Sequence, residues 1–431
     1  DADGYAPIRI EIRYGDRYGD HVDVVDEDDK EGSLLTNEKW NFLRETVIPG
    51  AKDWLERTVK VKPVTGPLRI PRLCETVYPF APTTGAYTED NCASVLDSSL
   101  EKCGYGIVIP ESYLAEQGYC SSLSGSECIE AGVVPAGAGV NDADIVIFVT
   151  ASSHPTRDVN DKCGSSTAAF AAQCAQDQHD RPIAGHINFC PEKLDPTGDV
   201  DTQIKTALHE IMHVLAFSSS LFPWWRDADG NPRTAREADG RPPKNSCGQY
   251  QADPSTVATA TLRDHTVFRL VTPAVVSEAR LQFGVTGTCA AADGGEIENE
   301  GSSCEGVVQP GSHFETRMFL NEVMTASSDA NLGSVFSRMS LAALEDSGWY
   351  AVNYTSAEFL AWGKDGGCAF PRDKCLGSPK SDPTPLDDQL FCAASGVIGC
   401  NPGNTAYGPC GSFYTYSSDL PAHSQYFTDP R

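Results

Sequence analysis

The sequence lacks any hydrophobic run long enough to cross a membrane. A transmembrane helix needs about 18 or more consecutive apolar residues, and no stretch of the 431 residues approaches that length. The most apolar run, residues 144–150, is short and rich in β-branched side chains, which is typical of a buried strand. We therefore expect no transmembrane segment in this chain, while membrane anchoring through a segment outside it stays open.

Positive charge is also scarce. Lys and Arg together number 33 against 60 Asp and Glu, which makes the formal net charge −27. Such an acidic surface repels the phosphate backbone of nucleic acids, because binding to that backbone depends on Lys and Arg. The charge balance therefore excludes nucleic acid as an expected partner. It carries no information on the oligomeric state.

No pair of cysteines has the C-x-x-C spacing, although the chain carries 16 cysteines. Zinc ribbons and thioredoxin-type redox motifs therefore have no support. A large, even number of cysteines is typical of disulfide-bonded proteins from oxidising compartments, so we expect all of them to pair and the protein to be secreted or exposed at the cell surface. Since the chain opens at Asp1 and not at Met, we expect that a signal peptide and a pro-segment have been removed.

Hydrophobic periodicity predicts an α+β chain. The length suggests two or three domains, and we place them at residues 1–217, 218–366 and 367–431, the last being a small Cys-rich portion. Alternating or β-branched patterns predict strands over residues 7–14, 142–150 and 183–189. Helical spacing predicts helices over residues 37–59 (in two pieces broken at 49–50), 199–215, from 271 onward, and 337–347. The Gly-, Glu- and Ser-rich stretch 284–311 is expected to be a loop.

Two histidines lie four residues apart in the predicted helix, within TALHEIMHVLAFS at residues 206–218. Positions i and i+4 share one face of a helix, so His209 and His213 can direct imidazole nitrogens at one zinc ion. Glu210 lies beside them, where a carboxylate can act as general base on a zinc-activated water. The HExxH motif is only moderately specific, and its alternative is a pair of partly buried helix histidines without a metal.

A catalytic zinc needs a third protein ligand. The short spacing used by some metalloproteases would need a histidine at position 219, where this chain has serine. Downstream, His313 follows a Gly/Ser-rich stretch and precedes Met324. His265 competes for the same role, although its apolar neighbours favour a structural one.

Several stretches together resemble the leishmanolysin family, including its invadolysin-like branch, in which an insertion separates HExxH from the third histidine. They are residues 181–191 (RPIAGHINFCP), 206–218, 222–234, 271–280 (VTPAVVSEAR), 312–325 (SHFETRMFLNEVMT), 341–353 (LAALEDSGWYAVN) and 362–363. The resemblance implies that His209, His213 and His313 bind Zn²⁺, that Glu210 is the general base, and that Met324 is the methionine of a Met-turn beneath the histidines. It also implies a metzincin-type catalytic portion, with a mixed sheet over the active-site helix.

By this resemblance the protein is a zinc endopeptidase that cleaves peptide bonds of protein or peptide substrates. The alternative is a catalytically silent adhesion or structural ectodomain that keeps the fold. The presence of Glu210 argues against that alternative, because an inactive site has no chemical need for the carboxylate. A secreted zinc-dependent amidase also stays open.

Two further positions carry expectations. The metzincin pattern has glycine where Ala216 stands, and alanine adopts a left-handed conformation only at a cost of about 1 kcal/mol or more. We therefore expect a strained or differently shaped helix end. Asn353 begins the sequon Asn-Tyr-Thr and is a candidate glycosylation site.

Overall fold

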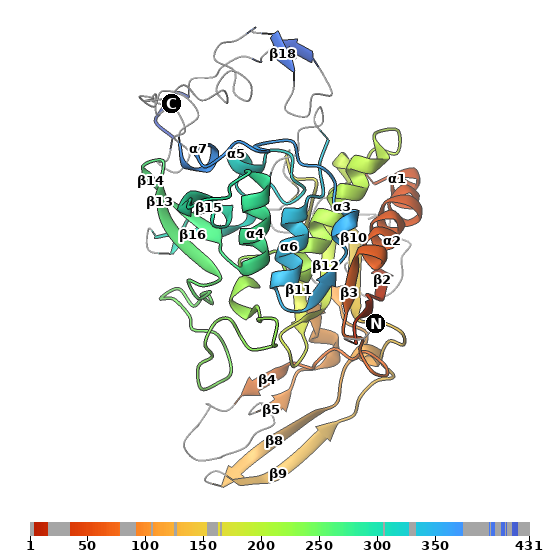
Figure 1. The fold of residues 1–431 in the computed structure, drawn as a ribbon. Coiled ribbons are helices and arrows are strands. Elements are labelled where there is room, and N and C mark those ends of the chain that lie inside the picture. Colours follow the sequence, from red (N-terminus) through yellow and green to blue (C-terminus); the bar gives the residue numbers. More distant parts are fainter. Residues whose placement is uncertain are drawn as a thin grey trace. The chain divides into compact units, whose positions relative to one another are not determined.

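Helices and several sheets alternate along the chain in the computed structural model, which confirms the α+β class (Figure 1). The structure describes residues 4–15, 35–77, 92–104, 107–124, 127–152, 163, 166–304, 307–326 and 333–373, and short stretches between 396 and 420. The chain divides into two units. The first comprises residues 1–216, 236–241 and 349–351, and the second comprises residues 217–235, 242–348 and 352–431. The domain boundaries expected from the sequence stay predictions.

The first unit is built on a four-stranded mixed sheet of order β11-β12-β10-β2. β10 runs parallel to both β2 and β12, while β11 runs antiparallel to β12. All of β12 and most of β10 are buried, as expected for strands covered on both faces. The three predicted strands are confirmed. The four strands are β2 (Ile10–Tyr14), β10 (Ile145–Ala151), β11 (Ala169–Gln176) and β12 (Pro182–Phe189).

A long helical segment in the same unit corrects one prediction. α1 (Asn37–Phe42), a π-helical turn (Leu43–Val47) and α2 (Ile48–Thr58) follow one another without the break expected at residues 49–50. Pro49 is the second residue of α2, which directly follows the π-helical turn. Gly50 faces another helix, since a Cβ there would lie 2.6 Å from Ile204 Cδ1. The glycine therefore permits close helix packing and does not end the helix.

Short paired strands and disulfides complete the first unit. The described bridges of the chain are Cys74–Cys92, Cys103–Cys174, Cys120–Cys128, Cys163–Cys190 and Cys289–Cys368, the last in the second unit. The short strands are β1 (Ala6–Pro7), β3 (Val59–Val61), β4 (Cys74–Val77), β5 (Cys92–Val95), β6 (Lys102–Cys103), β7 (Ile107–Val108), β8 (Gln117–Ser124), β9 (Glu127–Val134) and β17 (Tyr350–Val352).

The expectation that all cysteines pair is wrong for Cys400, which is exposed and free. It ends β18 (Ile398–Cys400) and lies opposite Tyr407 of β19 (Tyr407–Pro409), so its cross-strand neighbour offers no thiol. Cys247 is disulfide-bonded. The prediction that the remaining cysteines are paired lies outside the described residues. It concerns the side chains of Cys304, Cys375, Cys392 and Cys410.

The second unit contains a four-stranded antiparallel sheet of order β13-β14-β15-β16. Its last two strands occupy most of the stretch expected to be a loop, so that prediction is wrong. Their composition lacks a strand pattern. They form strands because β15 pairs with β14 and β16 pairs with β15, and this pairing outweighs the low local propensity. The strands are β13 (Val257–Leu262), β14 (His265–Leu270), β15 (Gly295–Cys304) and β16 (Val307–Phe314).

Helices α4 (Pro273–Gln282) and α6 (Arg338–Asp346) confirm the two helices predicted for this unit. Asp346 accepts a hydrogen bond from the backbone N–H of Val275 at 2.9 Å, and Arg338 binds both carboxylate oxygens of Glu278 at 2.7 Å. The remaining helices are α5 (Thr316–Phe319) and α7 (Ala369–Arg372). Among the described residues, every helix is too short or too polar to traverse a lipid bilayer.

Candidate metal centre

Helix α3 (Val200–Leu215) carries the HExxH motif in the first unit. Its start agrees with the sequence pattern, since the side chain of Asp199 caps the helix by accepting from the backbone N–H of Thr202 at 3.1 Å. The helix packs against the mixed sheet. Gly185 of β12 leaves room for it, because a Cβ there would lie 2.3 Å from Val214 Cγ1. The sheet and the cap together fix the axis and the rotation of α3.

The side chains of His209 and His213 bring their Nε2 atoms close together. The Nε2 atoms of His209 and His213 lie 3.0 Å apart, and the two rings are perpendicular. Two nitrogens that each lie about 2.0–2.1 Å from one tetrahedral ion would be separated by roughly 3.3 Å. The spacing on the helix therefore suits a pair of ligands to one metal ion.

Glu210 is almost completely buried, with 4% of its surface exposed. Its Oε2 atom has no hydrogen-bond partner among the described residues. Burial raises the pKa of the Glu210 carboxyl to about 8, and a cation bound nearby would favour the ionised form instead. A buried carboxylate oxygen without a partner is rare in folded proteins, and its presence fits a site completed by a ligand.

His313 lies in the second unit, within a bulge of β16. Ile297 pairs with Phe314 and Asn299 pairs with Pro310, so Gly311, Ser312 and His313 face the single residue Glu298. The Nδ1 atom of His313 contacts the Glu298 carboxylate, and a carboxylate on one ring nitrogen is the kind of partner that orients a metal-binding histidine. Bulges of this kind re-aim side chains near functional sites.

Met324 lies in a tight turn next to that bulge. The turn is closed by the backbone N–H of Thr325, which donates to the carbonyl of Glu322 at 3.1 Å. The N–H of Phe314 donates to the carbonyl of Met324 at 2.8 Å, and the Met324 side chain is fully buried. This turn is attached to the residue that follows His313, and the role of Met324 as the methionine of a Met-turn stays a prediction.

His209, His213 and His313 form one group. A ligand nitrogen from each lies within 4.8 Å of the other two, so this donor set could hold a metal ion. His265, the competing candidate, is not in the group. It is buried at the start of β14, where its Nδ1 lies 3.2 Å from the carbonyl oxygen of Arg263.

Two further predictions concern the helix end at Ala216 and the glycosylation site at Asn353. Ala216 ends α3 with φ −160° and ψ −32°, so it does not adopt the left-handed conformation, the expected strain does not arise and the helix end is differently shaped. Asn353 is exposed, and its side-chain oxygen accepts from the Thr355 hydroxyl at 2.7 Å. Its glycosylation stays a prediction.

Glu298, Gly311 and Glu322 are residues that sequence reasoning missed. The first two fall in the stretch taken for a loop, where only the strand pairing reveals that they face each other. Glu322 lies two residues before Met324, and the spacing E-x-M was the only signal for it.

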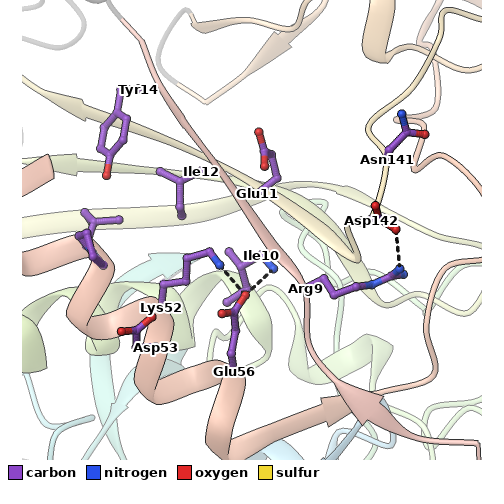
Figure 2. Close-up of a pocket in the computed structure, with 12 residues that line it drawn as sticks. Arg9, Ile10, Glu11, Ile12, Tyr14, Lys52, Asp53, Glu56, Asn141 and Asp142 are labelled. Atoms are coloured by element: carbon purple, nitrogen blue, oxygen red, sulfur yellow. Dashed lines mark hydrogen bonds and ion pairs between the residues drawn. The ribbon is translucent and has the colours of Figure 1, made fainter. Parts of the chain in front are cut away.

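A separate pocket in the first unit lies between β2 and α2 (Figure 2). None of the predicted site residues lines it. Its two cations are already paired, since Lys52 binds Glu56 and Arg9 binds Asp142 at 3.8 Å. The described lining therefore contains neither a histidine nor an uncompensated cation for a metal or anion site.

Several known proteins are similar to this chain over most of its length. The family model for leishmanolysin matches residues 118–431. The chain is 35% identical over 389 residues to a leishmanolysin-like peptidase of Caenorhabditis elegans, which covers 86% of this chain and 52% of the relative. It is 34% identical over 356 residues to a leishmanolysin-like peptidase of Drosophila melanogaster, covering 79% and 49%.

A third relative carries a different name. The chain is 32% identical over 368 residues to a ciliated left-right organizer metallopeptidase of Mus musculus, covering 83% of this chain and 46% of the relative. This chain thus spans about half the length of the curated relatives it matches. The match over most of its residues, together with the HExxH helix, means that the chain belongs to the leishmanolysin family of metallopeptidases.

Proposed function

We propose that this protein is a zinc-dependent endopeptidase that hydrolyses peptide bonds of protein substrates outside the cell. The observation that carries the proposal is the group of three histidine nitrogens, together with the buried Oε2 atom of Glu210, which has no hydrogen-bond partner among the described residues and belongs to the helix that carries two of the histidines. The disulfides support an oxidising compartment and hence an extracellular location.

His209, His213 and His313 would hold the metal as neutral imidazoles. Three histidines with no thiolate and no ligating carboxylate are a donor set that zinc accepts in catalytic sites, with one position left open. When bound, zinc supplies Lewis-acid chemistry that polarises a carbonyl and acidifies water. The contact between Glu298 and His313 Nδ1 would fix the ring orientation and tautomer of that ligand.

Glu210 would serve as the general base and then as the general acid. Glu210 follows His209 directly in the helix, so its side chain points in a different direction from those of His209 and His213. It is therefore not expected to bind the metal together with them. Its carboxylate accepts a proton as water attacks the peptide carbonyl, and it then delivers that proton to the leaving amine. Water exclusion around this buried side chain strengthens both steps.

Met324 would be the methionine of the Met-turn, an apolar residue beneath the ligands. Its side chain is fully buried, and its carbonyl is bonded to the residue after His313. A thioether in this place fills space without competing for the metal.

Cleavage of casein or a peptide library, together with measured zinc content, tests the proposal. We expect stoichiometric zinc, peptide hydrolysis, loss of activity with 1,10-phenanthroline and recovery on adding zinc. A protein that binds zinc fully but cleaves none of these substrates would favour the silent ectodomain. Cleavage of small amides without peptides would favour the amidase.

A further inference from the structure

We propose that Glu322 is a positioning residue of the metal centre, whose carboxylate ties the Met324 turn and the adjoining end of β16 to the N-terminus of α6. The inference rests on the proposed function, because it concerns the geometry of the third histidine ligand. It concerns residues of the second unit only, so every contact used below lies within one body.

Glu322 is a buried carboxylate with four hydrogen-bond donors. It is 1% exposed. Its Oε2 accepts from the backbone N–H of Met324 at 2.6 Å. Its Oε1 accepts from the backbone N–H of Ser337 at 3.3 Å and from the hydroxyls of Ser337 at 2.8 Å and Ser340 at 2.6 Å. One oxygen therefore holds the turn, while the other holds the first turn of α6.

The segment before the turn needs such an anchor. Leu320, directly after α5, has φ 42°, a left-handed conformation that costs a leucine about 1–2 kcal/mol. Strain of this kind persists only where surrounding contacts over-determine the backbone. The hydroxyl of Thr325 contributes one contact, to the carbonyl of Leu320 at 3.1 Å. Glu322 contributes the tether to a separate element.

The turn is in direct contact with the His313 region. Phe314 N–H donates to the Met324 carbonyl at 2.8 Å, and Phe314 forms an isolated parallel bridge with Thr325. A shift of the turn would therefore be transmitted to the residue next to His313. Since both Phe314 and Met324 are fully buried, the packed surroundings leave little room for compensation.

The network requires two acceptor oxygens. The backbone N–H groups of Met324 and Ser337 bind different oxygens of the same carboxylate. Glutamine has one oxygen and one NH₂ group, so one of these two backbone donors would face another donor. Glu322→Gln therefore removes one main-chain tether while preserving the size and shape of the side chain.

The experiment compares Glu322→Gln with Asp346→Asn. Asp346 is a buried carboxylate at the opposite end of α6 that accepts from Val275 N–H, so it controls for general loss of stability. We measure the Kd for zinc by competition with a chromophoric chelator, the absorption spectrum of the Co²⁺-loaded protein, and Tm. We expect Glu322→Gln to weaken zinc binding about tenfold or more and to alter the cobalt spectrum. Asp346→Asn is expected to lower Tm alone.

Ser340→Ala provides a milder variant in case Glu322→Gln does not fold. It removes one donor to Oε1 and is expected to weaken zinc binding about two- to fivefold. Unchanged zinc affinity and cobalt spectrum in the folded variants, with only Tm reduced, would overturn the inference and leave Glu322 a purely structural residue. A wild-type protein that binds no zinc would overturn the proposed function and this inference with it.

Discussion

Glu298 contacts Nδ1 of His313 across a bulge, and Gly311 is the residue that makes the contact possible. A Cβ on Gly311 would lie 2.3 Å from Glu298 Cγ, so any larger residue would push the carboxylate away from the histidine. The orientation of the proposed third ligand thus depends on a residue that carries no functional group.

Gly311→Ala should weaken zinc binding about tenfold, since outer-shell partners of metal-bound histidines typically contribute tenfold or more to affinity. Gly287→Ala is the matched control, because a Cβ there meets nothing within 4 Å. Competition with a chelator measures both affinities. Equal affinity in the two variants would show that the Glu298 contact does not orient the ligand.

His313→Ala should weaken zinc binding sharply and abolish peptide cleavage, whereas His265→Ala should retain both. His313 belongs to the three-histidine group, and His265 lies outside it against the Arg263 carbonyl. Two helix histidines alone leave zinc with too few protein ligands for a catalytic site. Zinc content after dialysis and cleavage rates check the prediction, and the reverse pattern would refute the ligand assignment.

Glu210→Gln should keep zinc bound and the fold intact while cleavage falls by several orders of magnitude, because the amide cannot accept the proton. The carboxylate is not in the three-histidine group, and its buried Oε2 makes no hydrogen bond among the described residues. Atomic absorption and a peptide assay measure the two properties. Loss of zinc in this variant would identify the carboxylate as a ligand.

Asp144→Asn should reduce the free energy of unfolding by about 3 kcal/mol at neutral pH, because it removes the fully buried carboxylate of an ion pair and leaves its hydrogen-bond donors without their charged acceptor. The fully buried carboxylate accepts from Arg9 Nε and from the backbone N–H groups of Arg9 and Val64 at 2.7–3.0 Å. Urea unfolding measures the loss. Asp142→Asn is the control, since that side chain is 94% exposed and its ion pair with Arg9 spans 3.8 Å.

The difference in the free energy of unfolding between wild type and Asp144→Asn should disappear in acid. Burial by itself raises the pKa of Asp144, but the hydrogen bonds from Arg9 and Val64 outweigh it and the net pKa is lowered. A lowered folded pKa means that the stabilisation is complete above the unfolded value of about 3.9 and is lost as the pH falls through the folded value. Unfolding curves of wild type and Asp144→Asn should therefore converge in strong acid. A constant difference at all pH values would contradict this origin of the stability.

Local sequence determined the half of the site that lies on one helix. The four-residue spacing of His209 and His213, the Asp199 cap and the apolar face of α3 all follow from helical periodicity, which depends only on neighbouring residues. The family resemblance added the roles predicted for His313 and Met324, because a motif of several residues is more specific than a single histidine or methionine.

Tertiary structure alone decided what surrounds those residues. Strand pairing turned a Gly- and Glu-rich stretch into β15 and β16 and placed Glu298 against His313, although neither strand has a recognisable pattern. Packing against Ile204 explains Gly50 inside a continuous helix, and the contacts of Glu322 reach α6 across the intervening chain. These features depend on contacts between residues distant in sequence. No local propensity encodes them, because their free energy appears only when the partner element is in place.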